Sequence, residues 1–142
     1  MLVDANLLLF AVDSGSPFHR PALTWWTRVL SEPVRVGLPW ATLTAFLRIA
    51  THPRASHRPL LGADAWAIVE EWLRHPAVWV PAPTDRHHEV LGRLFARYRV
   101  AGNLVPDAHL AALAIEHGVT LCSADTDFAR FSELQWDNPV AG

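Results

Sequence analysis

The chain alternates between two hydrophobic patterns. Short apolar runs bounded by turn-forming residues predict buried strands, and they cover residues 1–6, 34–39, 77–83, 119–125 and 134–140. Longer segments in which apolar residues recur every three or four positions predict amphipathic helices, and they cover residues 16–32, 40–52, 62–76, 84–100 and 106–117. The first run stays apolar up to residue 12, which we interpret as a strand leading into a loop.

The order of these elements predicts the fold class. Strands that alternate with helices are joined by right-handed crossovers, and such units build a mainly parallel sheet covered by helices on both faces. Capping residues mark the expected helix ends, namely Ser16 with Pro17, Thr84, Pro106 with Asp107, and Gly118. The predicted fold is α/β, a three-layer α/β/α sandwich with a mainly parallel central sheet.

Helical spacing also predicts which side chains are buried. In the helix 16–32 it places Leu23, Trp26 and Leu30 on one face. The apolar stripe of the helix 62–76 consists of Trp66, Val69, Trp72 and Leu73. Most of the seven Trp residues lie in amphipathic helices or in a strand, namely Trp25, Trp26, Trp66, Trp72 and Trp79. We therefore interpret them as core or dimer packing rather than as stacking platforms for bases.

Composition limits the class of protein. With 142 residues, of which 51% are hydrophobic, the chain is expected to form a single domain, residues 1–142, with one continuous core. The net charge of −2 argues against a generally basic nucleic-acid binder. All twelve basic residues are Arg, which we attribute to a GC-rich genome rather than to phosphate binding.

Two features indicate a cytoplasmic protein without membrane association. The apolar N-terminal stretch is too short to span a bilayer and is interrupted by Asp4 and Asn6. The single cysteine, Cys122, cannot form an internal disulfide and is expected to be a small buried thiol.

Acidic residues stand near the carboxyl ends of the predicted strands. Asp4 follows the first strand, Asp125 ends the strand 119–125, and Asp107 lies in the first turn of the helix before that strand. Ligands of an open parallel sheet bind in the crevice beyond these strand ends. Carboxylates gathered there would repel one another unless a cation compensates them. Mg²⁺ or Mn²⁺ is the expected cation, because it prefers oxygen ligands and serves phosphate chemistry.

Each acid also has an ordinary structural explanation. Asp107 alone could be a helix-start carboxylate that interacts with the helix dipole. Asp125 and Asp127 alone could form an Asx turn. Asp4 is harder to explain in this way, because an acid directly after a buried strand is costly. Spacing alone leaves both interpretations open.

Four segments of the chain resemble the PIN-domain family, specifically the VapC-type toxins of bacterial toxin–antitoxin pairs. They are VDANLLLFAVD, GLPWATLTAFLRIATHPR, VPDAHLAALAIEHGVTLCSADTDFARF and LQWDNPV, in that order. A lone D-x-N motif is weak, but this ordered set with its flanks runs from end to end and is specific.

That resemblance implies a Mg²⁺- or Mn²⁺-dependent endoribonuclease that hydrolyses RNA and leaves a 5′-phosphate and a 3′-hydroxyl. The acidic site of the family maps onto Asp4, Asp107 and Asp125, with Asn6 supporting Asp4 and Asp127 as an accessory ligand. The resemblance also implies a small antitoxin protein as inhibitor and a homodimeric state.

One departure from the family pattern keeps a second function open. Many members carry Glu near the position of Ala45, and no acid occurs between Glu32 and Asp64 in this chain. Thr44 could supply a hydroxyl to water or to a ligand, but it brings no charge. The alternative is therefore a catalytically weakened PIN-like scaffold that binds RNA or protein. A flavodoxin-like or receiver domain is a more remote choice, since the chain lacks a phosphate-cradling Gly-rich loop and any Lys.

RNA binding also requires cationic contacts. Arg48, Arg54 and Arg58 follow the second predicted strand and are the candidates, although exposed Arg is also common without a ligand. The histidines show no compact zinc spacing, and the chain has one Cys, so a zinc site is not expected. They include His19, His52, His57, His87, His88 and His109.

Overall fold

The computed structural model describes residues 1–141 and contains a five-stranded sheet of order β3-β2-β1-β4-β5. Every neighbouring pair of strands is parallel. The strands are β1 (Leu2–Val3), β2 (Val36–Gly37), β3 (Val78–Trp79), β4 (Leu121–Cys122) and β5 (Trp136–Asp137). The helices are α1 (Ala5–Val12), α2 (His19–Ser31), α3 (Trp40–Ala50), α4 (Gly62–Arg74), α5 (His87–Arg97) and α6 (Leu104–His117), with a 3₁₀ helix η1 (Thr126–Arg130). The predicted α/β fold with a parallel sheet is confirmed.

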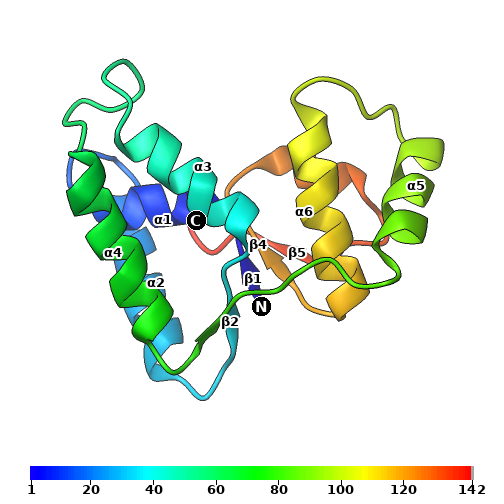
Figure 1. The fold of residues 1–142 in the computed structure, drawn as a ribbon, viewed down its shortest axis with the longest axis horizontal. Coiled ribbons are helices and arrows are strands. Elements are labelled where there is room, and N and C mark those ends of the chain that lie inside the picture. The colour runs from blue at the N-terminus through cyan, green and yellow to red at the C-terminus, as the bar shows by residue number, and fades with distance from the viewer. Residues whose placement is uncertain (142) are drawn as a thin grey trace.

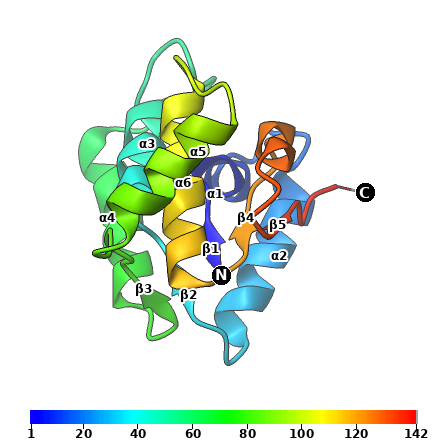
Figure 2. The same ribbon diagram turned by 90° about the vertical axis from the view of Figure 1, so that its right-hand side faces the viewer.

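Helices cover both faces of the sheet. The chain moves from β1 to β3 in one direction, and its right-handed crossovers leave α1 to α4 on one face; the return to β4 and β5 leaves α5, α6 and η1 on the other. Figure 1 views the sheet between these layers, with α1 to α4 on the left and α5 and α6 on the right. Figure 2 views the α5–α6 layer from its outer side.

The neighbouring strands β1 and β4 contribute side chains to both layers of the core. Because successive side chains of a strand point to opposite faces, Val3 and Cys122 join the core under α1 to α4, whereas Leu2 and Leu121 join the core under α5 and α6. Burial on both faces explains why these strands consist only of apolar residues. No helix within residues 1–141 is long and apolar enough to cross a membrane.

The loop predicted after the first strand is wrong, because residues 5–12 form helix α1. The Asp4 carboxylate accepts a hydrogen bond from the Ala5 N–H and so caps this helix. Leu and Ala are strong helix formers, and Leu7 and Leu8 are completely buried. A helix that is apolar over most of its surface lacks the polar face by which helices are recognised in a sequence.

The predicted buried faces of α2 and α4 are partly wrong. Leu23 and Trp66 are exposed, by 41% and 43% respectively. The buried residues of α2 are Ala22, Trp25, Trp26 and Val29, and those of α4 are Ala65, Val69 and Trp72. Ala22 and Ala65 lie at the contact positions together with larger residues, and the residues that directly follow them, Leu23 and Trp66, turn to the surface.

Helix starts also differ from the predicted capping residues. Ser16 and Thr84 each accept a hydrogen bond from the backbone two residues later, so they form turns before α2 and α5 rather than capping them. Helix α6 begins at Leu104, two residues earlier than predicted, and Pro106 is tolerated there because the first N–H groups of a helix have no helical partner. Gly118 ends α6 with φ = 66°, as predicted.

Candidate active site

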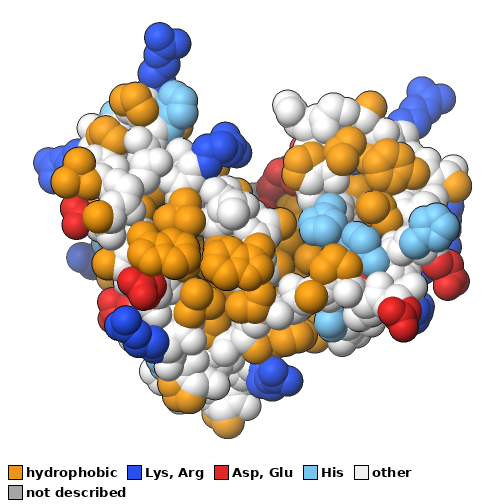
Figure 3. All heavy atoms as spheres, viewed as in Figure 1, with side chains coloured by type: hydrophobic (Ala, Val, Ile, Leu, Met, Phe, Trp, Pro, Cys, Tyr) orange, Lys and Arg blue, Asp and Glu red, His pale blue; other side chains and the backbone are white. Residues whose placement is uncertain are grey.

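The carboxyl ends of β1 and β4 lie side by side at the centre of the sheet. Val3 is paired with Cys122, and the Asp4 N–H donates to the Cys122 carbonyl at 3.0 Å. The residues that follow both strands therefore leave the sheet at one edge. Figure 3 shows a notch there between the two layers, with an acidic side chain exposed on its wall. We call it the acidic notch after its carboxylates, Asp4, Asp107, Asp125 and Asp127.

Three hydrogen bonds hold the Asp4 carboxylate in place. One oxygen accepts from the Ala5 N–H at 2.8 Å, and the other accepts from the Ser123 hydroxyl at 2.7 Å and from the Asn6 amide at 3.3 Å. Burial raises the pKa of Asp4, the hydrogen bonds from Ser123 and Ala5 lower it, and the charge of Asp125 raises it further. Asp4 thus has a fixed orientation within the chain's own hydrogen-bond network.

Ser123 is the residue of this network that sequence reasoning missed. Its side chain is completely buried. Besides donating to Asp4, its hydroxyl accepts from the Asn6 amide at 3.1 Å and from the Asp125 N–H at 3.0 Å. One donor and two acceptor positions are the full capacity of a hydroxyl, so Ser123 is saturated. The signal was a polar residue at the end of an apolar run.

A second group of carboxylates lies on the side of the notch formed by the start of α6 and the turn after β4. One oxygen each of Asp107, Asp125 and Asp127 lies within 4.8 Å of the other two. Asp107 comes from the first turn of α6, whereas Asp125 precedes η1 and accepts a hydrogen bond from the Asp127 N–H at 2.9 Å. Asp127 also forms an exposed ion pair with Arg130 at 3.4 Å. Asp4 does not belong to this group of three.

The pKa of Asp107 is raised to about 6, and burial is the largest cause. The charges of Asp125, Asp4 and Asp127 raise it as well, in that order, while Arg130 lowers it. The influence of Asp4 shows that it belongs to the same electrostatic cluster. The donor set consists only of carboxylate oxygens, which fits Mg²⁺ or Mn²⁺ and not a metal that prefers nitrogen or sulfur.

The remaining predicted site residues stand on or beyond α3. The Thr44 hydroxyl donates to the Trp40 carbonyl of its own helix at 2.7 Å, and Ala45 packs against the core under α1 to α4. Arg48 is exposed on α3, and Arg54 and Arg58 are exposed in the loop after it. Within residues 1–141, no hydrogen bond or ion pair joins these side chains to the four acids.

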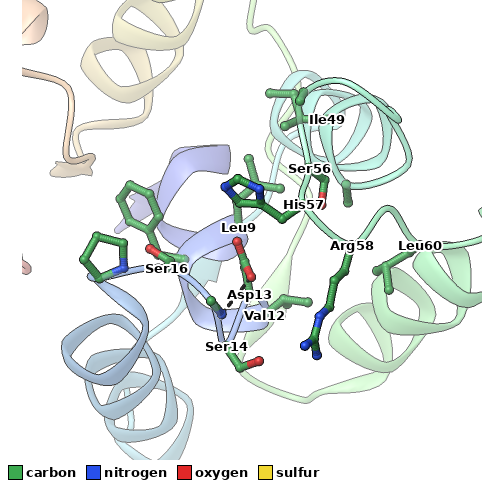
Figure 4. A pocket seen from close by; sticks show the side chains of 15 residues that line it. Leu9, Val12, Asp13, Ser14, Ser16, Ile49, Ser56, His57, Arg58 and Leu60 are labelled. Atoms are coloured by element: carbon green, nitrogen blue, oxygen red, sulfur yellow. Dashed lines mark hydrogen bonds between the residues drawn. The ribbon is translucent and has the colours of Figure 1, made fainter.

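A pocket of about 480 Å³ lies away from the acidic notch. Figure 4 shows it between the end of α1 and the loop after α3, with Leu9, Asp13, Ile49, His57 and Arg58 among the residues that line it. None of the four notch carboxylates lines this pocket. Arg58 is therefore a feature of the pocket rather than of the acidic notch.

Histidines link α5 to α6. One ring nitrogen of His87 contacts the buried Glu116 carboxylate at 2.7 Å, and the other contacts His109 at 3.1 Å. Burial lowers the pKa of His109, and the neighbouring His87 lowers it further. The contacts are internal to the α5–α6 layer, which favours a structural role for these rings.

Known proteins resemble this chain over its full length. Residues 1–134 match the PIN domain. Ribonuclease VapC37 of Mycobacterium tuberculosis is 44% identical over 140 residues, which cover 99% of this chain and 97% of the relative. Ribonuclease VapC33 of the same species is 42% identical over 140 residues, which cover 99% of this chain and 98% of the relative.

Solved structures show the same fold. VapBC2 from Rickettsia felis, bound to a DNA fragment from its promoter, has a TM-score of 0.70 at 14% identity, covering 96% of both chains. VapC20 of Mycobacterium tuberculosis, described as a sarcin-ricin loop cleaving toxin, has a TM-score of 0.67 at 22% identity, covering 94% of this chain and 98% of VapC20. The fold, the full-length match and the level of identity agree: the chain belongs to the PIN-domain family, among the relatives of the VapC ribonucleases.

Proposed function

We propose that this chain is a metal-dependent endoribonuclease and the toxin of a toxin–antitoxin pair. The observation that carries the proposal is the approach of three carboxylates to within 4.8 Å, beside the hydrogen-bonded Asp4. Membership of the PIN-domain family and relatives named ribonucleases support it.

Each acid has a role in this proposal. Asp107, Asp125 and Asp127 hold Mg²⁺ or Mn²⁺, and Asp4 completes the set from the β1 side. The cation, when bound, would activate water and stabilise charge on the phosphate. Asn6 and Ser123 orient Asp4 through the hydrogen bonds described above. Asp107 has to lose its proton before it can bind a cation, so binding strengthens as the pH rises through about 6.

RNA is the proposed substrate, cleaved to leave a 5′-phosphate and a 3′-hydroxyl. Its phosphates need cationic partners. Arg48 and Arg54 are exposed on α3 and in the loop after it, and they are proposed to contact the RNA backbone. Arg58, which lines the pocket, is a weaker candidate for the same strand.

We propose a small antitoxin as the inhibitor, with an Arg side chain that enters the acidic notch and neutralises its carboxylates. Similar folds occur in structures of VapBC proteins from Rickettsia felis and nontypeable Haemophilus influenzae. A homodimer is proposed as well, and exposed apolar side chains such as Phe95 and Val105 are available for it. The proposed site of action is the cytoplasm.

The alternative of a weakened PIN-like scaffold is favoured by one observation. Ala45 packs against the core, and the nearest polar side chain on α3, Thr44, is bonded to its own helix. The wall formed by α3 therefore offers no carboxylate to the notch.

Incubation of the purified chain with RNA separates the two functions. The nuclease proposal requires cleavage with Mg²⁺ or Mn²⁺ that disappears on chelation and in the Asp4→Asn variant. RNA or partner binding that persists without any cleavage supports the scaffold instead.

A further inference from the structure

Helix α3 carries a stripe of exposed side chains beside the acidic notch. Trp40, Thr44 and Arg48 are spaced by four residues, which places them on one face of the helix, and all three are exposed. Trp40 is 48% exposed, whereas Trp side chains are highly buried on average. The rise of the helix separates Trp40 from Arg48 by about 12 Å along its axis.

Trp66 of α4 extends this surface sideways. The rings of Trp40 and Trp66 are nearly parallel, with an interplanar angle of 13° and centroids 6.4 Å apart. Since both side chains keep more than two fifths of their surface exposed, each offers ring area to another flat group. Figure 3 shows a hydrophobic patch with flat ring faces over α3 and α4, next to the notch.

The start of α3 is fixed to the edge of the sheet where the acids gather. Thr42 is buried in the first turn, and its hydroxyl donates to the Val3 carbonyl at 2.8 Å, one residue before Asp4. The stripe therefore begins beside the acidic notch and follows the α3 wall away from it. Arg48 has no ion-pair partner among residues 1–141, so its charge is available to an anion.

We propose that Trp40, Trp66 and Arg48 form a track for unpaired RNA, in which a base stacks on the indole rings and a phosphate binds Arg48. The track rests on the proposed ribonuclease function and specifies its substrate class. Aromatic rings beside a cation are the combination by which proteins hold single strands, because every base has a face that can stack. Paired bases are not free to splay onto such rings. The track thus selects single-stranded RNA without reading its sequence.

Binding can be measured without cleavage in the Asp107→Asn background. The probe is a short single-stranded RNA carrying 2-aminopurine, compared with the same RNA annealed to its complement. We expect Trp40→Ala to weaken single-strand affinity by about 5- to 150-fold and Trp40→Phe to retain most of it. Arg48→Gln should lower the salt dependence of affinity by about 0.7 in logarithmic slope. Phe18→Ala removes another exposed aromatic side chain, which directly precedes α2 and lies beside Phe10 of α1; it is the matched control and should not change the affinity for RNA.

The mass of each variant in solution is measured in parallel, because the same patch could pack against a second copy of the chain. Loss of single-strand affinity at unchanged mass supports the track. Unchanged affinity in Trp40→Ala overturns it, as does affinity that is lost only together with a change in oligomeric mass. If metal-dependent cleavage depends on Asp107 while Trp40→Ala binds RNA normally, the nuclease proposal stands and the track alone fails.

Discussion

Two walls of the acidic notch, the β1 wall and the α6 wall, hold their carboxylates in opposite ways. On the β1 side, Asp4 accepts three hydrogen bonds from the chain. On the α6 side, Asp107 accepts none from residues 1–141, and burial with three neighbouring acids raises its pKa to about 6. The chain itself therefore stabilises the charge of Asp4 by hydrogen bonds, whereas the repulsion among the carboxylates on the α6 wall is relieved only by an added cation. Changes on the two walls should therefore have different consequences.

The largest expected effect is a loss of activity without a loss of folding when Asp107 on the α6 wall is replaced. Asp107→Asn should lower metal-dependent RNA cleavage by more than about 100-fold, since even residues that only support metal ligands cost 10- to 100-fold. The fold should persist, because the substitution removes repulsion and breaks no hydrogen bond. Cleavage assays and circular dichroism check both statements. Asp64→Asn, an exposed acid in the first turn of α4, is the matched control and should cleave normally.

Changes on the β1 wall should lower both the stability and the activity of the protein. Ser123→Ala leaves the half-buried Asp4 without its shortest hydrogen bond, so we expect about 1–3 kcal/mol lower stability and about 10- to 100-fold weaker activity. Chemical denaturation and cleavage assays measure these losses, with the exposed Ser14→Ala as control. A Ser123→Ala protein that is destabilised yet fully active would show that the orientation of Asp4 has no part in the reaction.

Much of the pH dependence of stability should come from Asp107 on the α6 wall, and Asp4, whose pKa burial also raises, should act in the same direction. Because the folded pKa of Asp107 lies near 6 and its ordinary value is 3.8, the folded state keeps a proton that the unfolded chain has lost between these values. Stability is therefore greater below this window and falls as the pH rises through it. Partial exposure of Asp107 limits the effect to about 1 kcal/mol.

Denaturation of the metal-free protein at pH 4.5 and pH 7 measures that dependence. Asp107→Asn should lose part of the fall and be more stable than wild type at pH 7. Identical pH profiles for the two proteins would contradict a raised pKa of Asp107 in the folded state.

The smallest effect is expected where α3 is fastened to β1. Thr42→Val removes the buried hydrogen bond to the Val3 carbonyl and should cost about 1 kcal/mol. Thr44→Val removes an exposed hydroxyl that bonds only within its helix, so its cost should be close to zero. Equal losses of stability in the two variants would show that this contact does not hold α3 in place.

The common location of the acids could be predicted from the sequence, because the carboxyl ends of the strands lie at the same edge of any parallel sheet. Asp4 and Asp125 follow β1 and β4, and Asp107 opens α6, so their common edge required only the order of the elements. The sequence did not reveal that the three acids with oxygens within 4.8 Å of one another include Asp127 and not Asp4. That arrangement depends on the turn of η1, where Asp125 accepts a hydrogen bond from the Asp127 backbone.

Other parts of the structure had no clear periodic signal. Helix α1 is apolar on most sides, so its sequence resembled a strand and a loop. Trp66 fits an apolar stripe by spacing, but whether such a stripe is covered depends on neighbours that the sequence does not place. In the sequence, Ser123 was only one polar residue at the end of an apolar run. Its role in orienting Asp4 comes from hydrogen-bond partners that are up to 119 residues away in the chain.

Titration of the purified protein with Mn²⁺, followed by electron paramagnetic resonance, tests the metal site most directly. Wild type and Asp64→Asn should bind Mn²⁺ alike, with affinity that increases as the pH rises through about 6, and Asp107→Asn should bind it more than about 100-fold more weakly. Absence of Mn²⁺ binding at millimolar metal, or equal binding by Asp107→Asn, would contradict a cation held by these carboxylates.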